Sequence, residues 1–293
     1  MAMQETINLR KKREFGEVFN ATIMFLKQEY KLLGKAFLYY VLPVSIVIAI
    51  LSSYSQVAML RNMNFAVSGS MLANYGNNFG RYMIIYGLMI INQAIMLSLV
   101  FGYIKLYLEK GSGNFQLQDV FEMMKASFIK MLLAMLLVFV IVMVGLVLCV
   151  IPGIYLGVSL SIIFCIIMFE NKGIGEAFSR SFELTRIQWW WTFLILFVSS
   201  VIVALIVYIL AIPATLFGLS IGMHQIKNPG ILPESMGLLF IIYSSVMSII
   251  SYILYIIPFT VIAFQYFNLV EIKEMPSLIE KIDLMSNEDP KNM

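Results

Sequence analysis

The sequence predicts an all-α polytopic membrane protein with about six transmembrane helices, and three observations lead to this prediction. Hydrophobic residues make up 60% of the 293 residues and charged residues only 13%, whereas soluble domains carry about 25% charged residues. Long apolar segments recur along the chain, without the alternation of polar and apolar residues that is typical of strands. Basic residues gather in alternate connecting segments. Lipid is therefore the solvent expected around most of the surface.

Six segments are long enough, or nearly long enough, to cross a bilayer core, which takes about 20 apolar residues in a helix. These segments are 36–54, 82–108, 129–151, 153–169, 190–217 and 236–270. The fourth is short and follows Pro152 and Gly153, which predict a tight turn between two spans. The sixth is longer than a bilayer requires, so either Pro258 kinks it or its end extends beyond the membrane.

Lysine and arginine orient the predicted spans, because cytoplasmic loops retain positive charge. With both termini in the cytoplasm, 17 of the 20 basic residues fall on the cytoplasmic side and only Arg61, Arg81 and Lys227 on the other. Of the 17 acidic residues, only Glu234 then falls in an outer loop. We therefore expect both termini to be cytoplasmic. The first strong apolar run begins near Leu33, so no cleavable signal peptide is expected.

A short pattern occurs three times, each time before an odd-numbered span. The copies are Phe15-Gly-Glu17-Val18-Phe19, Leu117-Gln-Asp119-Val120-Phe121 and Ile174-Gly-Glu176-Ala177-Phe178. Apolar residues recur at helical spacing after each start, which predicts amphipathic helices at the inner interface. The acid of each copy would lie in the first helical turn, where the positive helix end favours it.

These copies predict one membrane domain over 1–293, built from three units that each join an interfacial amphipathic helix to a transmembrane hairpin. The units cover about 13–110, 115–172 and 173–273, and 274–293 is a cytoplasmic tail. Chance similarity among amphipathic helices is the alternative interpretation.

The sequence offers no cluster of reactive side chains. Cys149 and Cys165 both fall within apolar runs and are interpreted as small core residues. The only histidine, His224, is expected in an outer loop. No metal-ligand spacing, glycine-rich phosphate loop or nucleophile elbow is present. We therefore expect no enzymatic activity, no metal and no cofactor, and the net charge of +3 does not suggest a nucleic-acid partner.

Part of the chain resembles a known family. The residues that carry the resemblance are Pro152-Gly-Ile-Tyr155, the segment Glu170-Asn-Lys-Gly-Ile-Gly-Glu-Ala-Phe-Ser-Arg-Ser-Phe-Glu-Leu-Thr-Arg186 and the tryptophans 189–191. They resemble a broad family of bacterial multi-pass proteins that includes the membrane domain attached to some glycerophosphodiester phosphodiesterases. The resemblance is clearest over about 150–195. It implies a bacterial inner-membrane location and the six-span plan. The phosphodiesterase activity belongs to a soluble catalytic barrel that this sequence lacks, so no catalytic residue is carried over.

The sequence favours a non-enzymatic membrane scaffold or accessory subunit that contacts lipid or another membrane protein at its cytoplasmic face. Charged residues and predicted amphipathic helices gather on that face. The candidate contact residues are Glu170, Arg180, Glu183, Arg186, Trp189 and Trp190. The charged side chains could pair with one another, with lipid phosphates or with a partner, and the tryptophans fit an interfacial aromatic belt.

A transporter or channel for a small or lipidic solute is the alternative function. Asn92, Gln93 and Gln265 place uncharged polar groups within predicted spans. A continuous polar cavity lined by all three would favour transport. Burial in separate packed interfaces would instead favour helix–helix hydrogen bonding.

Overall fold

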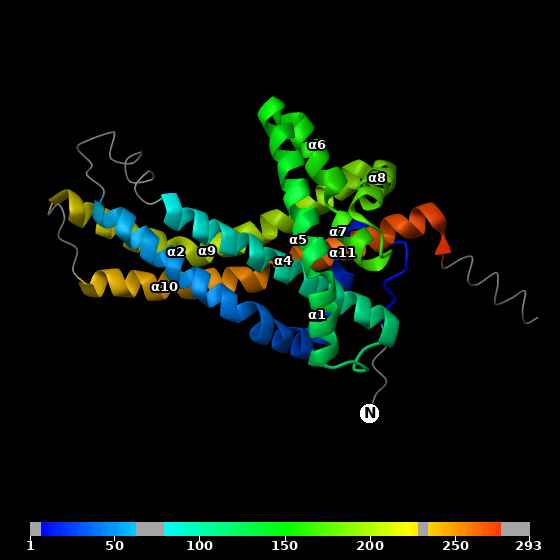
Figure 1. Cartoon of the computed structure of the whole chain (residues 1–293), viewed down its shortest axis with the longest axis horizontal. Coiled ribbons are helices and arrows are strands. Elements are labelled where there is room, and N and C mark those ends of the chain that lie inside the picture. The colour runs from blue at the N-terminus through cyan, green and yellow to red at the C-terminus, as the bar shows by residue number, and fades with distance from the viewer. Residues whose placement is uncertain (1–6, 63–78, 228–233, 277–293) are drawn as a thin grey trace, which may run out of the picture. The chain divides into compact units, whose positions relative to one another are not determined.

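The computed structural model describes residues 7–62, 79–227 and 234–276, and every regular element in these ranges is a helix (Figure 1). In chain order the elements are α1 (Phe15–Ala36), the π-helical turn η1 (Phe37–Val41), α2 (Leu42–Asn62), α4 (Phe79–Lys110), α5 (Leu117–Leu148), α6 (Val150–Leu160), α7 (Ile163–Phe169), α8 (Ile174–Thr185), the 3-10 turn η2 (Arg186–Gln188), α9 (Trp189–Lys227), α10 (Glu234–Leu254) and α11 (Ile256–Glu274). Within the described residues, six helical segments are long and apolar enough to cross a membrane. The predicted all-α polytopic class is therefore confirmed.

The chain divides into two compact units. The first takes its residues from 1–36, 97–200 and 257–293, and the second takes its residues from 37–96 and 201–256. Helices α4 and α9 therefore each contribute residues to both units. The first unit contains the charged residues that the sequence singled out.

Phe25 of α1 lies at the centre of the aromatic core of the first unit. Its ring meets Tyr103 and Tyr107 of α4 and Phe264 of α11 edge to face, with centroid distances of 6.3, 5.1 and 5.9 Å. Such pairs contribute about 0.5–1.5 kcal/mol each beyond the apolar area they bury. One fully buried side chain thus joins three helices that are far apart in the sequence.

Glu29 of α1 is a buried acid in the same unit, and its carboxylate is hydrogen-bonded at both oxygens. The Tyr103 hydroxyl donates to one oxygen at 2.6 Å, and the Ser112 hydroxyl donates to the other at 2.5 Å. Ser112 lies between Gly111 and Gly113, whose positive φ angles of 81° and 76° allow the sharp turn after α4. Because a buried carboxylate without partners would be costly, these bonds fix α1 against the end of α4.

Helices α5 and α6 form a tight hairpin in which Cys149 is the single non-helical residue. An added Cβ on Gly153 would lie 2.7 Å from the backbone nitrogen of Leu146, and one on Gly145 would lie 3.0 Å from the Cα of Gly153. Only glycine allows so close an approach. The turn was predicted at Pro152 and Gly153, but it lies at Cys149, because Pro152 occupies the first turn of α6, where no helical hydrogen bond needs its N–H.

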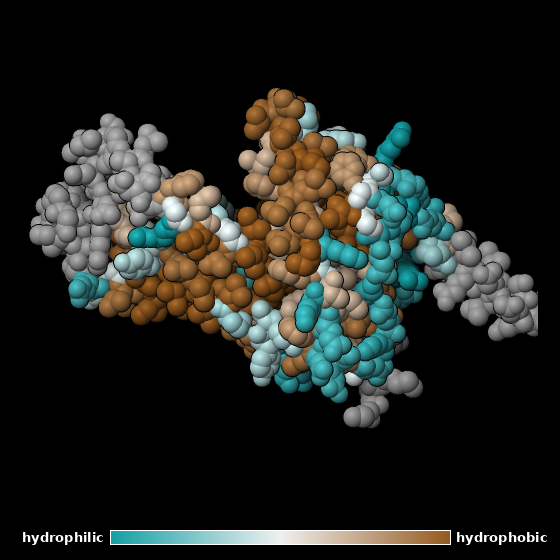
Figure 2. Space-filling model, in the orientation of Figure 1, coloured by the Kyte–Doolittle hydropathy of each residue, from teal (hydrophilic) through white to brown (hydrophobic). Residues whose placement is uncertain are grey.

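The hairpin surface is apolar. Figure 2 shows mainly hydrophobic side chains over its visible face. Around Cys149, the side chains of Val147, Leu148, Val150 and Ile151 are 82%, 78%, 61% and 76% exposed. A helix with apolar residues spread so widely is suited to a membrane rather than to water.

Helix α8 packs along α6. The hydroxyls of Ser181 and Thr185 donate to the carbonyl of Ser159 at 2.5 and 3.3 Å. The ring of Tyr155 lies 6.4 Å from that of Phe182 and stacks on Trp189 at 5.6 Å. These contacts fix α8 beside α6 within the first unit.

The second unit pairs α2 with α10 through small polar residues. The Ser245 hydroxyl donates to the Ser53 hydroxyl at 3.2 Å and to the Ala49 carbonyl at 3.3 Å. The Tyr243 hydroxyl donates to the Leu210 carbonyl of α9 at 2.8 Å. Small residues permit the close helix packing that is common in membranes.

Several predicted boundaries differ from the structure. The first span continues to Asn62 rather than ending at 54, and the sixth segment divides at Tyr255 into α10 and α11. Pro258 lies in the first turn of α11, so the break precedes the proline rather than following it. The predicted outer-loop position of His224 is wrong, because His224 lies in α9. Most of the predicted tail, from 277 on, lies outside the described residues.

The three acids of the repeated pattern each lie in the first turn of a helix. The backbone N–H of Glu14 donates to the Glu17 carboxylate at 2.9 Å, and that of Gln116 donates to the Asp119 carboxylate at 2.7 Å. Both acids therefore cap a helix start. The repeat over whole units stays a prediction.

We expect Gly153→Ala to lower the free energy of unfolding by about 1–3 kcal/mol, because the added methyl group forces α5 and α6 apart. Gly157→Ala is the matched control on the same helix, since its Cβ would meet only Val142 Cγ1 at 3.9 Å. Thermal unfolding of both variants in detergent, followed by tryptophan fluorescence, measures the difference. Equal unfolding temperatures would show that the close approach of Gly145 and Gly153 does not hold the hairpin.

Candidate functional site

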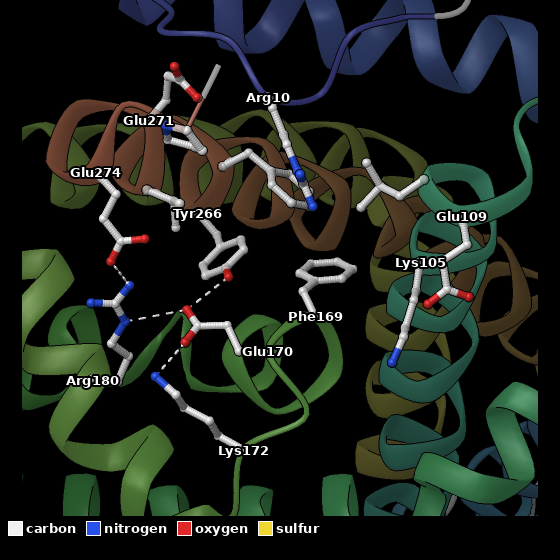
Figure 3. A pocket seen from close by; sticks show the side chains of 14 residues that line it. Arg10, Lys105, Glu109, Phe169, Glu170, Lys172, Arg180, Tyr266, Glu271 and Glu274 are labelled. Atoms are coloured by element: carbon white, nitrogen blue, oxygen red, sulfur yellow. Dashed lines mark hydrogen bonds and ion pairs between the residues drawn. The ribbon is translucent and has the colours of Figure 1, made fainter. Parts of the chain in front are cut away.

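The short connection between α7 and α8 positions the charged residues of the site. Helix α7 ends where the N–H of Glu170 donates to the Ile166 carbonyl at 3.0 Å, and α8 begins where the N–H of Ala177 donates to the Gly173 carbonyl at 2.9 Å. Between them, Asn171 has a φ of 54°, a left-handed conformation that asparagine tolerates. The resulting turn directs Glu170 and Lys172 toward each other, and Glu170 also faces Arg180 of α8 (Figure 3).

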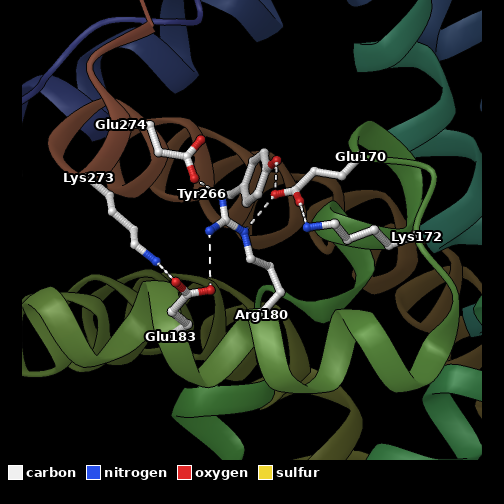
Figure 4. A network of polar contacts seen from close by, with 7 residues as sticks. All are labelled: Glu170, Lys172, Arg180, Glu183, Tyr266, Lys273 and Glu274. Atoms are coloured by element: carbon white, nitrogen blue, oxygen red, sulfur yellow. Dashed lines mark hydrogen bonds and ion pairs between the residues drawn. The ribbon is translucent and has the colours of Figure 1, made fainter.

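Arg180 is the centre of a group of ion pairs, and its side chain is only 12% exposed. Its guanidinium lies 3.4 Å from the Glu170 carboxylate and 3.3 Å from that of Glu183, one turn further along α8. It also pairs with Glu274 of α11 (Figure 4). Arginine suits this position because its planar guanidinium donates in several fixed directions at once.

Two further cations and a tyrosine complete the group. Lys172 lies 2.7 Å from the Glu170 carboxylate, and the Tyr266 hydroxyl donates to the same carboxylate at 3.0 Å. Lys273 of α11 pairs with Glu183. We call these seven residues the Arg180 cluster: Glu170, Lys172, Arg180, Glu183, Tyr266, Lys273 and Glu274. The cluster joins the α7–α8 turn and α8 to α11.

The pKa of the Glu170 carboxyl lies below its ordinary value. Burial raises this pKa, but the hydrogen bonds from Lys172 and Tyr266 and the charge of Arg180 outweigh burial and lower it. Glu170 is therefore ionised at neutral pH, and its negative charge balances the cations around it.

A cavity of about 550 Å³ lies beside the Arg180 cluster (Figure 3). Its lining includes four basic side chains, Arg10, Lys105, Lys172 and Arg180, and four acidic ones, Glu109, Glu170, Glu271 and Glu274. The ammonium of Lys105 donates to the Asn171 side chain at 2.6 Å, which ties α4 to the α7–α8 turn. The cavity is also lined by aromatic and apolar side chains, those of Phe169, Tyr266, Phe267 and Val270. The cavity is thus amphipathic and balanced in formal charge.

The structure brings three of the six predicted contact residues together. Glu170, Arg180 and Glu183 share the cluster, whereas Arg186 is exposed, and none of the ion pairs found in the described part of the chain includes it. Six residues advance an α-helix by about 240° beyond one full turn, so Arg186 starts from another face than Arg180. Trp189 stacks on Phe193 and Tyr155, and Trp190 is 75% exposed.

Sequence reasoning missed the residues from α11. Tyr266 and Glu274 lie 96 and 94 residues from their partners Glu170 and Arg180. The sequence does repeat a glutamate followed closely by a lysine after the second, fourth and sixth segments, as Glu109-Lys110, Glu170-Asn-Lys172 and Glu271-Ile-Lys273. That similarity was a usable signal for Lys273, but it did not indicate which helices meet.

Two of the three polar residues proposed to line a solute path, Asn92 and Gln265, belong to separate packed interfaces, and the third, Gln93, is half-buried. In the second unit, the Ser45 hydroxyl donates to the Asn92 side chain at 3.3 Å. In the first unit, the Gln265 amide donates to the Thr192 hydroxyl at 3.0 Å and its oxygen accepts from Asn268 at 3.2 Å. The contacts of Asn92 and Gln265 are those of helix packing, and the transport hypothesis stays a prediction.

No group of three or more His, Cys, Asp or Glu side chains within the described ranges could hold a metal ion. In comparisons with known proteins, no family model, no curated protein and no solved structure matches the chain. The resemblance over 150–195 therefore stays a prediction.

We expect Arg180→Ala to lower the free energy of unfolding by about 1–3 kcal/mol, less than the 3–5 kcal/mol typical of a fully buried pair, because the partner carboxylates are partly exposed. Arg186→Ala is the matched control, since an exposed substitution of this kind changes stability by less than about 0.5 kcal/mol. Unfolding curves in one detergent measure both. A loss of equal size in the two variants would contradict a structural role for the cluster.

The lowered pKa of Glu170 predicts a dependence on pH. A carboxyl group whose pKa is lower in the folded state than in the unfolded state stabilises the fold at pH values above its unfolded pKa, which is about 4.3 for glutamate. That stabilisation is lost as the pH falls through the pKa of the folded state. Wild type should therefore unfold at a higher temperature than Glu170→Gln at pH 7. The difference between the two unfolding temperatures should become smaller below about pH 4.3. A difference that stays constant from pH 7 to pH 3 would show that ionised Glu170 contributes nothing.

Proposed function

We propose that this protein is a non-enzymatic scaffold or accessory subunit of the bacterial cytoplasmic membrane, which binds another membrane protein at its cytoplasmic face. The site for that partner is the cavity beside the Arg180 cluster. This orientation follows from the distribution of lysine and arginine, because all four cations of the cavity belong to the set assigned to the cytoplasmic side.

The balance of charge in the cavity is the observation that carries the proposal. A site built for a phosphate group is expected to hold an excess of cations, because the ligand brings only negative charge. This cavity instead offers four basic and four acidic side chains. Mixed charge complements a protein segment that carries both signs, and complementary charges select partners and set their orientation.

The surroundings of the cavity also suit a protein partner. Tyr266 and Phe169 place aromatic rings among the charged groups, with ring centroids 5.5 Å apart. Protein interfaces are typically enriched in aromatic residues and arginine at their centres. Because ion pairs hold Arg180 and Glu170 in place, a partner would meet side chains that are already ordered, which lowers the entropic cost of binding.

Native mass spectrometry of the tagged protein, extracted with its lipids from the native host, tests the proposal. We expect a protein partner at fixed stoichiometry. A monomer that retains only a lipid would indicate lipid binding instead, and a monomer with neither protein nor lipid would contradict the scaffold function.

The variant Glu109→Lys tests the cavity as the binding site. Glu109 is exposed and lines the cavity outside the Arg180 cluster, so its reversal changes the charge balance without breaking the ion pairs. We expect at least a tenfold loss of the complex, since an unfavourable charge contact in an interface costs several kcal/mol. Glu122→Lys, which reverses an exposed acid on α5, is the matched control and should retain the partner. Equal recovery with both variants would place the interface elsewhere.

A further inference from the structure

Helix α6 by itself is too short to cross a bilayer, and the segment Val150–Phe169 reaches 20 residues only when α7 is added to it. Helix α6 contains 11 residues, which at 1.5 Å per residue span about 16 Å, against a hydrocarbon core of about 30 Å. Ser161 (φ -58°, ψ -34°) and Ile162 (φ -90°, ψ 0°) then form a turn with backbone angles close to helical, and it leads into α7, whose 7 residues are mostly buried within the first unit. Apolar helices of this length are typical of buried or re-entrant segments rather than of full spans.

The turn of the α5–α6 hairpin is unsuited to water. From Met131 to Val158 the sequence contains no charged residue, and Tyr155 and Cys149 are the only side chains there with a polar atom. A turn that reaches water usually carries Gly, Asn, Asp or Ser. Here Cys149 is the single turn residue and its four apolar neighbours are 61–82% exposed.

The contacts between α6 and α8 limit how far the turn can reach. Helix α8 exposes Glu176 and Glu183 and places Arg180 in the ion-pair cluster, so its polar side belongs at the aqueous interface. The hydroxyls of Ser181 and Thr185 donate to the carbonyl of Ser159, which lies nine residues after Val150, the first residue of α6, so Val150 lies at most about 14 Å further away. From the stacked pair of Tyr155 and Trp189 the remaining distance is only about 8 Å.

We infer that the α5–α6 hairpin is a re-entrant segment that enters the membrane from the side of the Arg180 cluster and returns to that side. Its turn at Cys149 ends in the hydrocarbon layer, and its exposed surface contacts lipid acyl chains. Four of the six apolar segments then cross the membrane, and both termini still lie on one side.

The distribution of exposed residues identifies lipid as the neighbour of the hairpin. At 100° per residue, the exposed apolar positions of α5 from Leu133 to Leu148 cover an arc of roughly 200°. Another helix covers a narrower stripe than this. Lipid chains surround a helix from all open directions, and they suit the absence of hydrogen-bonding groups on this surface.

Thiol labelling tests the position of the turn, because Cys149 lies there naturally. In the full chain with Cys165→Ala, Cys149 is the single thiol. Glu234→Cys and Asn114→Cys, each in a chain with both natural cysteines changed to alanine, mark the exposed start of α10 and the connection before α5. We expect a charged, impermeant maleimide to label the two markers from opposite sides of sealed vesicles, and to label Cys149 from neither side until the protein is denatured in dodecyl sulfate.

Labelling of Cys149 from the side of Glu234→Cys would show that the hairpin crosses the membrane and would overturn the inference. Labelling from the side of Asn114→Cys would place the turn in water and would overturn it as well. A nitroxide attached to Cys149 then separates lipid from protein as the neighbour. High accessibility to oxygen with low accessibility to a water-soluble nickel chelate is expected in lipid, whereas low accessibility to both would mean that protein covers the turn and would contradict the lipid contact.

Discussion

The Arg180 guanidinium forms ion pairs with three carboxylates that come from different parts of the chain, and the charged end of the first unit depends on this interaction. Glu170 comes from the α7–α8 turn, Glu183 from α8 and Glu274 from α11. Without the arginine, three carboxylates would surround a largely buried position, and among the ion pairs of the described residues only those of Lys172 with Glu170 and of Lys273 with Glu183 would remain. Because Glu170 stays ionised and also binds Lys172 and Tyr266, the same cluster fixes the wall of the neighbouring cavity. The same set of ion pairs therefore stabilises the first unit and shapes the proposed binding site.

A second constraint comes from the apolar helices, which hold few polar groups and must satisfy them internally. Ser159 shows how this is done, because its carbonyl accepts from two hydroxyls of α8. Gln265 likewise finds partners within its own unit, whereas Asn92 is bound only at its side-chain oxygen, and its buried amide nitrogen has no hydrogen-bond partner among the described residues. In both cases the polar groups of the apolar segments serve packing. Polar groups that remain available for a partner lie instead around the cavity next to Arg180.

Composition and hydropathy were sufficient to predict the helical class and the six apolar segments, because lipid restricts the chain to helices with satisfied backbones. They were not sufficient for local geometry. The α5–α6 turn lies at Cys149 rather than at Pro152 because it depends on the contact of Gly145 with Gly153, which pairs two helices. The pairing of Glu170 with Arg180 was within reach of the sequence, since they are ten residues apart. The part played by Glu274 was not, because nothing in one sequence reveals that α11 lies against α8.

A double-mutant cycle between Arg180 and Glu274 tests most directly whether the cluster holds the first unit together. The free energies of unfolding of wild type, Arg180→Ala, Glu274→Ala and the double variant are measured in one detergent. If the ion pair joins α8 to α11, the sum of the two single losses of unfolding free energy should differ from the loss in the double variant by about 1–3 kcal/mol, as for residues in one ion-pair network. Losses that add to within about 0.5 kcal/mol would show that the two side chains act independently, and would contradict the account.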